Sequence, residues 1–181
     1  MCISTWSAGP AGRNLVPAGH ADTTESTTMF GHRKHTIAAA DREHGAAVLA
    51  WTDGDLDEAE RAARTALKLR ERASKEDTPS IAADAKTLAD VLAARDARAE
   101  ANALYQRALA VYRRYGRQYD AALCLRGLGR LHADTEPAVS RQRLLHALWI
   151  KRALLGGIHP EVAELLEDLA ALPAATTAPQ R

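Results

Sequence analysis

A spaced set of small and apolar residues recurs along this chain, and it constrains the fold more than any other feature. Four positions in one segment have counterparts 42 positions further along, and these have counterparts another 39 positions on. The sets are Ala59, Ala63, Ala66 and Leu67; Ala101, Tyr105, Ala108 and Leu109; and Ser140, Leu144, Ala147 and Leu148. Within a set, the spacing puts all four side chains on one helix face. A repeat of this length is typical of two-helix units that stack because one pair alone cannot bury its apolar face.

Helix start and stop signals divide the chain into seven expected helices. Asp55 is a suitable N-cap with Glu58 three residues later, and Pro79 and Pro160 suit the first position of a helix. Gly116 suits the position after a helix end. The expected ranges are 36–51, 56–73, 79–94, 97–115, 119–133, 137–155 and 160–172.

The two ends of the chain lack a helical or strand period. Residues 1–34 are rich in Gly, Pro and Thr, and their few apolar side chains cannot offset the entropy of ordering them. We expect a disordered leader over residues 1–34, a helical repeat domain over residues 35–172 and a flexible tail over residues 173–181. The start of the chain has no basic segment followed by an apolar run, so we expect no signal peptide.

Composition argues against several classes of function. The 24 Lys and Arg residues nearly balance the 23 Asp and Glu residues, and acidic residues intersperse the basic clusters at 113–117 and 141–152. We therefore expect a solvated mixed surface and no nucleic-acid partner. No stretch approaches the roughly 20 apolar residues of a membrane helix, so we expect no membrane partner. Cys2 and Cys124 have no ligand-like spacing, and we expect a reducing, cytoplasmic setting.

The sequence offers no clear catalytic or metal centre. His32, His35 and His44 form the only histidine cluster, and no zinc-site ligand pattern accompanies them. No glycine-rich phosphate loop follows a strand, and no Ser or Cys stands in a nucleophile motif. A general acid–base pair needs a pocket that shifts a pKa, and nothing in the sequence implies one. We expect no enzyme activity, no metal and no cofactor.

The linker before the last expected helix reads Leu-Gly-Gly-Ile-His-Pro-Glu-Val-Ala over residues 155–163. Small residues also occupy the positions where paired helices would cross: Ala47, Ala59 and Ala66; Ala89, Ala101 and Ala108; and Gly129, Ser140 and Ala147. In both features the chain resembles the tetratricopeptide repeat, in the long form of kinesin light chain and of many bacterial signalling proteins. The resemblance spans residues 36–172. It implies an all-α, right-handed α-solenoid of antiparallel helix hairpins, with about three repeats and a closing helix.

Two other architectures compete with this one. HEAT-type repeats have a similar length of about 40–47 residues, and a compact helical bundle needs no repeat at all. The small-residue positions and the His-Pro linker argue against the former, and the 42-residue register argues against the latter.

In the resembling family, ligands lie in a groove lined by the first helix of each pair. The equivalent positions here, with the last helix extending the row, are His44, Val48, Trp51, Lys86, Asp90, Ala93, Arg126, Arg130, Ala133 and Glu167. Arg126 and Arg130 lie four residues apart on one helix face, so both would point at one acidic group, although a surface pair explains them equally well. Trp51 is either a binding anchor or a core residue that closes the first hairpin.

The sequence therefore favours a non-enzymatic interaction module that binds a peptide or partner protein in this groove. The alternative is a regulatory or sensor domain that acts with a bacterial transcription or signalling protein. A helical enzyme is a third hypothesis, which no catalytic motif supports. The last helix is half a hairpin and either caps the array or pairs with a second copy in a homodimer. The leucines that it has to cover are Leu165, Leu166, Leu169 and Leu172.

Overall fold

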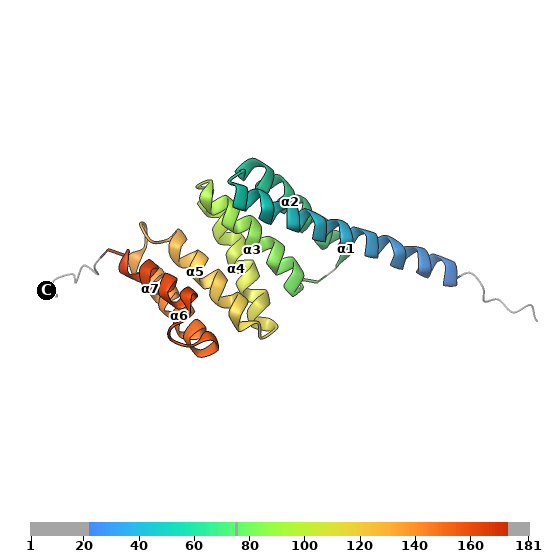
Figure 1. Cartoon of the computed structure of the whole chain (residues 1–181). Coiled ribbons are helices and arrows are strands. Elements are labelled where there is room, and N and C mark those ends of the chain that lie inside the picture. Colours follow the sequence, from blue (N-terminus) through green and yellow to red (C-terminus); the bar gives the residue numbers. More distant parts are fainter. Residues whose placement is uncertain (1–21, 75, 174–181) are drawn as a thin grey trace, which may run out of the picture.

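The computed structural model describes residues 22–74 and 76–173, with residues 22–32 described by their backbone alone. Seven α-helices and no strand occur in this part of the chain, so the predicted all-α repeat fold is confirmed. The helices lie beside one another in chain order and form a layered array (Figure 1). They are α1 (Asp22–Asp53), α2 (Leu56–Ala73), α3 (Pro79–Ala94), α4 (Arg98–Arg114), α5 (Gln118–Leu131), α6 (Pro137–Leu155) and α7 (Pro160–Ala170).

The predicted start of the first helix at Thr36 is wrong, because α1 begins at Asp22. Residues 22–34, which we expected to belong to the disordered leader, are helical, and this part of α1 projects past the other helices (Figure 1). The segment contains no proline, and extending an existing helix costs less free energy than nucleating a new one. Residues 1–21 and 174–181 lie outside the described part, so the disorder expected there stays a prediction.

Local capping sets most of the helix ends, and the other six helices begin and end within two residues of the predicted ranges. The Asp55 carboxylate accepts a hydrogen bond of 3.0 Å from the backbone N–H of Glu58, which confirms the predicted N-cap of α2. Thr78 caps α3 through its hydroxyl, with Pro79 at the first helical position. Gly116 follows α4 with a φ of +67°, a conformation that glycine adopts without strain.

The helices pack as hairpins, α1 on α2, α3 on α4 and α5 on α6. At each crossing the small residues that the sequence pattern singled out are buried, which lets the two backbones approach closely. The closest approach is at Gly129, where an added Cβ would lie 2.7 Å from Cγ of Leu144. Beside it, the buried Ser140 hydroxyl donates a hydrogen bond of 2.7 Å to the Gly129 carbonyl. The crossing on α5 therefore has no room for a side chain.

Neighbouring hairpins are joined by ion pairs between their second helices. We call the surface where side chains of α2 and α4 meet the first seam, and the equivalent surface between α4 and α6 the second seam. Across the first seam, Arg64 donates two hydrogen bonds to Glu100, at 2.6 and 2.8 Å. Arg107 donates to Glu71 at 2.6 Å and to Asp77 at 2.6 Å. The bond from Arg107 is the main reason that the pKa of Asp77 lies below its ordinary value, so this acid is ionised at neutral pH.

None of the described helices combines the length and the apolar character that crossing a bilayer requires.

Gly129→Ala is expected to lower the free energy of unfolding, because the new methyl group collides with Leu144. Overpacking costs about 1–3 kcal/mol, and the better helix propensity of alanine returns about 1 kcal/mol, so we expect a net loss of about 1 kcal/mol. The matched control is Gly45→Ala in α1, where nothing lies within 4 Å of the added Cβ. It should raise the free energy of unfolding by about 0.5–1 kcal/mol. Urea denaturation of both variants checks the opposite signs, and a shift of the same sign at both sites would refute the close crossing.

Candidate partner-binding groove

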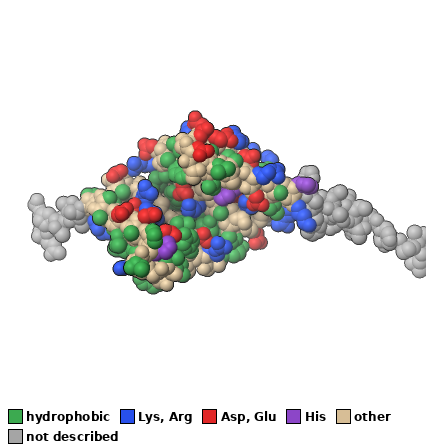
Figure 2. Space-filling view, in the orientation of Figure 1, with side chains coloured by type: hydrophobic (Ala, Val, Ile, Leu, Met, Phe, Trp, Pro, Cys, Tyr) green, Lys and Arg blue, Asp and Glu red, His purple; other side chains and the backbone are tan. Residues whose placement is uncertain are grey.

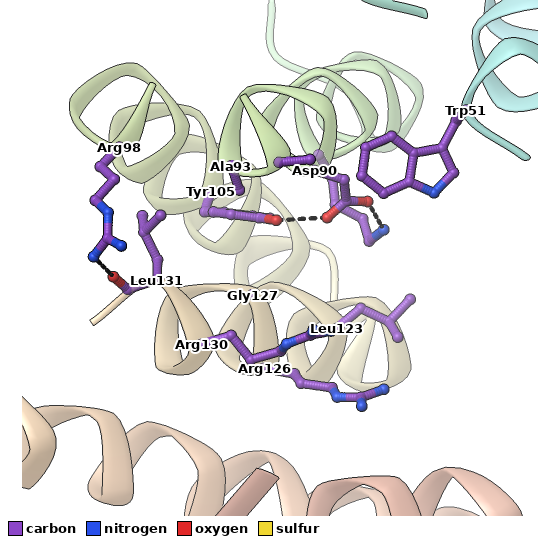
Figure 3. A pocket seen from close by; sticks show the side chains of 12 residues that line it. Trp51, Asp90, Ala93, Arg98, Tyr105, Leu123, Arg126, Gly127, Arg130 and Leu131 are labelled. Carbon is purple, nitrogen blue, oxygen red and sulfur yellow. Dashed lines mark hydrogen bonds and ion pairs between the residues drawn. The ribbon is translucent and has the colours of Figure 1, made fainter. Parts of the chain in front are cut away.

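A pocket of about 470 Å³ opens between α1, α3 and α5. Figure 2 shows a hollow on this side of the molecule, bordered by basic and acidic side chains. The close view in Figure 3 shows α3 and α4 on one side and α5 opposite, with the Trp51 side chain at one end. The lining residues are Trp51, Lys86, Asp90, Ala93, Ala94, Arg98, Tyr105, Leu123, Arg126, Gly127, Arg130 and Leu131.

Five of the eight charged or bulky side chains proposed for the groove line this pocket: Trp51, Lys86, Asp90, Arg126 and Arg130. They come from the first helices of three successive hairpins, because equivalent positions of stacked repeats face the same side. Trp51 is 38% exposed and lies at the end of α1, so its indole is available to a ligand. Ala93 also lines the pocket, whereas Ala133 does not.

Asp90 is the polar centre of the α3 wall. Its carboxylate accepts a hydrogen bond of 2.6 Å from the Tyr105 hydroxyl and another of 2.6 Å from Lys86 (Figure 3). Burial, with the neighbouring Asp90 charge, raises the pKa of Tyr105 far above its ordinary value. Tyr105 therefore remains a protonated phenol and a permanent donor to Asp90.

Glycine at position 127 makes room for this tyrosine. A Cβ on Gly127 would lie 2.5 Å from the Tyr105 ring, so only glycine lets the ring pass between α3 and α5 to reach Asp90. The ring thereby forms part of the pocket floor.

The two arginines of α5 are not equivalent. Arg126 donates to Asp168 at 2.5 Å and also to Glu164, both on α7. Burial alone would lower the pKa of Arg126, but these hydrogen bonds outweigh it and raise the pKa. Arg130 is 66% exposed and lies 3.8 Å from Asp168, a much weaker contact. Arg126 is thus a structural link to α7, whereas Arg130 is the more exposed of the two arginines.

Three of the eight charged or bulky groove residues predicted above do not line the pocket. His44 points at Asp84, a fully buried carboxylate of α3, with Nδ1 and Oδ1 2.8 Å apart but without hydrogen-bond geometry. Arg70 of α2 holds the same carboxylate through a 2.5 Å hydrogen bond. Val48 is exposed on α1 outside the pocket, and Glu167 is exposed on α7. His44 of α1 therefore lies in a contact between the first and second hairpins, next to the carboxylate of Asp84.

Sequence reasoning missed the contribution of second helices to the pocket. Tyr105 and Arg98 come from α4, and Leu123, Gly127 and Leu131 come from other turns of α5. One signal was present for Tyr105: its counterparts in the repeat are Ala63 and Leu144, so it alone adds a hydroxyl to a core position. A buried hydroxyl needs a hydrogen-bond partner, and the nearest charged side chains are those that line the groove.

The arrangement offers fixed charges, an aromatic wall and a rigid floor, which suit recognition. The only free cysteine among the described residues, Cys124, is buried, and burial raises the pKa of its thiol to about 12. Its thiolate is therefore scarce at neutral pH. No group of three His, Cys, Asp or Glu residues in the described ranges could hold a metal ion.

The helical pairs and their shared groove define the class of this protein as an all-α helical repeat protein. Residues 36–114 match the sequence model of the tetratricopeptide repeat family. The match covers the first two hairpins apart from the projecting start of α1, and it supports the resemblance described above. No curated protein is similar enough to match the chain. Repeats of this family generally mediate contacts between proteins.

Tyr105→Phe is expected to lower the free energy of unfolding by about 1.5 kcal/mol, because Asp90 loses a hydrogen bond to a charged acceptor. Tyr112→Phe is the matched control: Tyr112 is equally buried, and no hydrogen bond joins its hydroxyl to another described residue. This variant should change the free energy by less than about 0.5 kcal/mol. Thermal and urea unfolding measure both, and an equal loss in the two variants would remove the special role of Asp90.

Proposed function

We propose that the whole array is a tetratricopeptide-type solenoid that acts as a non-enzymatic interaction module. It holds a peptide or an extended segment of a partner protein in the groove between α1, α3 and α5. The observation that carries this proposal is the pocket itself, with the exposed Trp51 at one end and the exposed Arg130 on the opposite wall. A rigid pocket of this kind binds a flexible segment without reordering itself.

The chemistry of the walls indicates what the segment offers. Trp51, Ala93 and Leu123 present apolar surface for a large side chain, and large aromatic residues dominate binding hot spots. Arg130 favours an acidic group, whereas Asp90 is already neutralised by Lys86. The best ligand therefore carries an apolar side chain next to a carboxylate.

We place this module in the cytoplasm, and we retain the kinesin-light-chain form of the repeat as its subclass, on the His-Pro linker at residues 159–160. The second candidate function is a regulatory or sensor domain that acts with a bacterial transcription or signalling protein. The projecting start of α1 favours it, because this helix extends beyond the array and provides a surface that another protein can bind (Figure 1).

Trp51→Ala combined with Arg130→Glu is expected to weaken partner binding at least about tenfold, since both ends of the pocket lose their anchors. Affinity capture from the native cell with quantitative mass spectrometry measures the recovery of partners. The control variant, Leu49→Ala with Lys68→Glu, removes an exposed apolar side chain and a cation outside the pocket. Arg126 is left unchanged because it holds α7. Unchanged recovery with the pocket variant, at unchanged helicity, would contradict the groove assignment.

We also propose that α7 pairs with α7 of a second copy. In α5 the positions Ala122, Leu125 and Gly129 are buried, and the equivalent positions of α7 are exposed. These are Ala163, Leu166 and Ala170. Each internal hairpin covers such a face with a helix that has small residues seven positions apart, and Ala163 and Ala170 have the same spacing. An antiparallel copy of α7 therefore meets the packing requirement, and such a pairing closes on itself.

The charges of α7 permit this pairing. Glu161 binds Lys151 and accepts a 2.9 Å hydrogen bond from Tyr119, and Arg126 binds both Glu164 and Asp168. Three of the four acids of α7 are thus paired within their own chain, and only Glu167 borders the open face. Two copies can approach with little repulsion.

Light scattering over a range of concentrations is expected to give twice the chain mass of 19.5 kDa. Leu166→Glu should return the protein to the monomer mass, because it places a charge in the apolar contact. Leu49→Glu, an equal change on exposed α1 surface, should leave the dimer intact. A monomer at every concentration would show that α7 only caps the array.

A further inference from the structure

The two seams of the array occupy equivalent places but carry different charges. The repeat register assigns each residue of the first seam a counterpart in the second. Arg64 and Glu100, which form a bidentate pair, correspond to Gln106 and Val139. The second seam therefore lacks this pair.

The second ion pair is also absent, because neither counterpart is acidic. Glu71 and Arg107 pair at 2.6 Å across the first seam, and their counterparts are Arg113 and His146. A carboxylate has been replaced by a guanidinium, so the two counterparts cannot attract each other. Ion pairs bridge α2 and α4 at the first seam, whereas the equivalent positions of α4 and α6 form no ion pair.

The opening is a trough of about 290 Å³ between α4, α5 and α6. Its floor consists of Leu109, Leu125 and Leu128, each at most 8% exposed. Its rim carries Gln106, Arg113, Gln142, Arg143 and His146. No carboxylate lines the trough.

The rim donors Arg113, Arg143 and His146 lack acidic partners among the described residues. Among the described residues, neither Arg113 nor His146 forms an ion pair or a side-chain hydrogen bond, and Arg143 makes only a 3.4 Å contact with the Leu128 carbonyl. The described residues therefore supply no carboxylate that matches this rim.

We propose that the second seam binds an acidic helical segment of a partner protein, with a Glu or Asp carboxylate held between Arg113, Arg143 and His146. A leucine-sized side chain of the same segment rests on the leucine floor. This site is separate from the groove, because no residue lines both pockets.

The first seam shows how such a segment is held. There, Glu71 and Glu100, projecting from neighbouring helices, receive arginine donors at 2.6–2.8 Å over a buried apolar layer. The second seam has an apolar layer and carries donors at Arg113, Arg143 and His146, but it lacks the acids. A small inorganic anion would satisfy the cations but leave the leucine floor exposed to water, whereas an amphipathic segment satisfies both.

The test uses the full chain and two fluorescent helical peptides measured by anisotropy. One peptide carries two Glu residues one turn apart beside a Leu, and its twin carries Gln in place of both Glu residues. We expect the twin to bind about tenfold more weakly, because it loses charge-assisted hydrogen bonds. A third peptide with Ala in place of the Leu should also bind more weakly. Equal affinity of the three peptides would overturn the proposal.

Arg113→Glu with His146→Arg rebuilds the ion pair of the first seam in the second. This variant should weaken binding of the Glu peptide about tenfold and should unfold at a higher temperature than the native chain. Lys68→Gln lowers the net charge by the same amount on α2 and should leave the affinity unchanged. Arg130→Glu, a groove variant, should also leave it unchanged.

Three results with these variants would also overturn the proposal. The rebuilt seam could bind the Glu peptide with unchanged affinity, or Lys68→Gln could lower the affinity by an equal factor. Alternatively, Arg130→Glu could lower the affinity while the seam variant does not. The last result would place the peptide in the groove. Failure of the groove to bind its own partner would leave these seam measurements intact.

Discussion

The close crossing of two helices within each hairpin is the contact on which the rest of the structure depends. Alanine, serine or glycine stands at every crossing, and at Gly129 even one additional carbon atom has no room. Because the crossings are alike, the first helices of successive hairpins present equivalent positions to one side. The pocket between α1, α3 and α5 follows from that regularity. The hairpins therefore pack alike and differ mainly in their polar side chains.

Most of the fold could be predicted because its signals are local. A one-face apolar period, an N-cap such as Asp55 and glycine at helix ends are readable within a few residues. The start of α1 was missed because residues 22–34 include many weak helix formers. They are helical because they extend the helix that follows them. Register alone placed five of the predicted residues at the pocket, because register determines where equivalent backbone positions lie. His44 was misplaced because only the tertiary structure reveals the buried charge of Asp84.

Charge is distributed over the array with less regularity than packing. The first seam is joined by arginine–carboxylate pairs, and the second has cations on both sides. Exposed ion pairs add little stability individually, so the repeat tolerates their loss at the second seam. Apolar and small positions are therefore nearly periodic in this chain, while charged positions are specific to each repeat. The charged positions therefore distinguish the surface of this array from that of other arrays.

Arg126 belongs to two parts of the molecule at once. Its guanidinium reaches the pocket wall, yet its hydrogen bonds anchor Asp168 and Glu164 of the terminal helix. An incoming carboxylate that recruits this guanidinium competes with those two acids and loosens the anchorage of α7. Thermodynamic linkage then works in both directions, and whatever steadies α7 reduces the pull of Arg126 on such a ligand. The stability of α7 is therefore coupled to any carboxylate that binds Arg126 in the pocket.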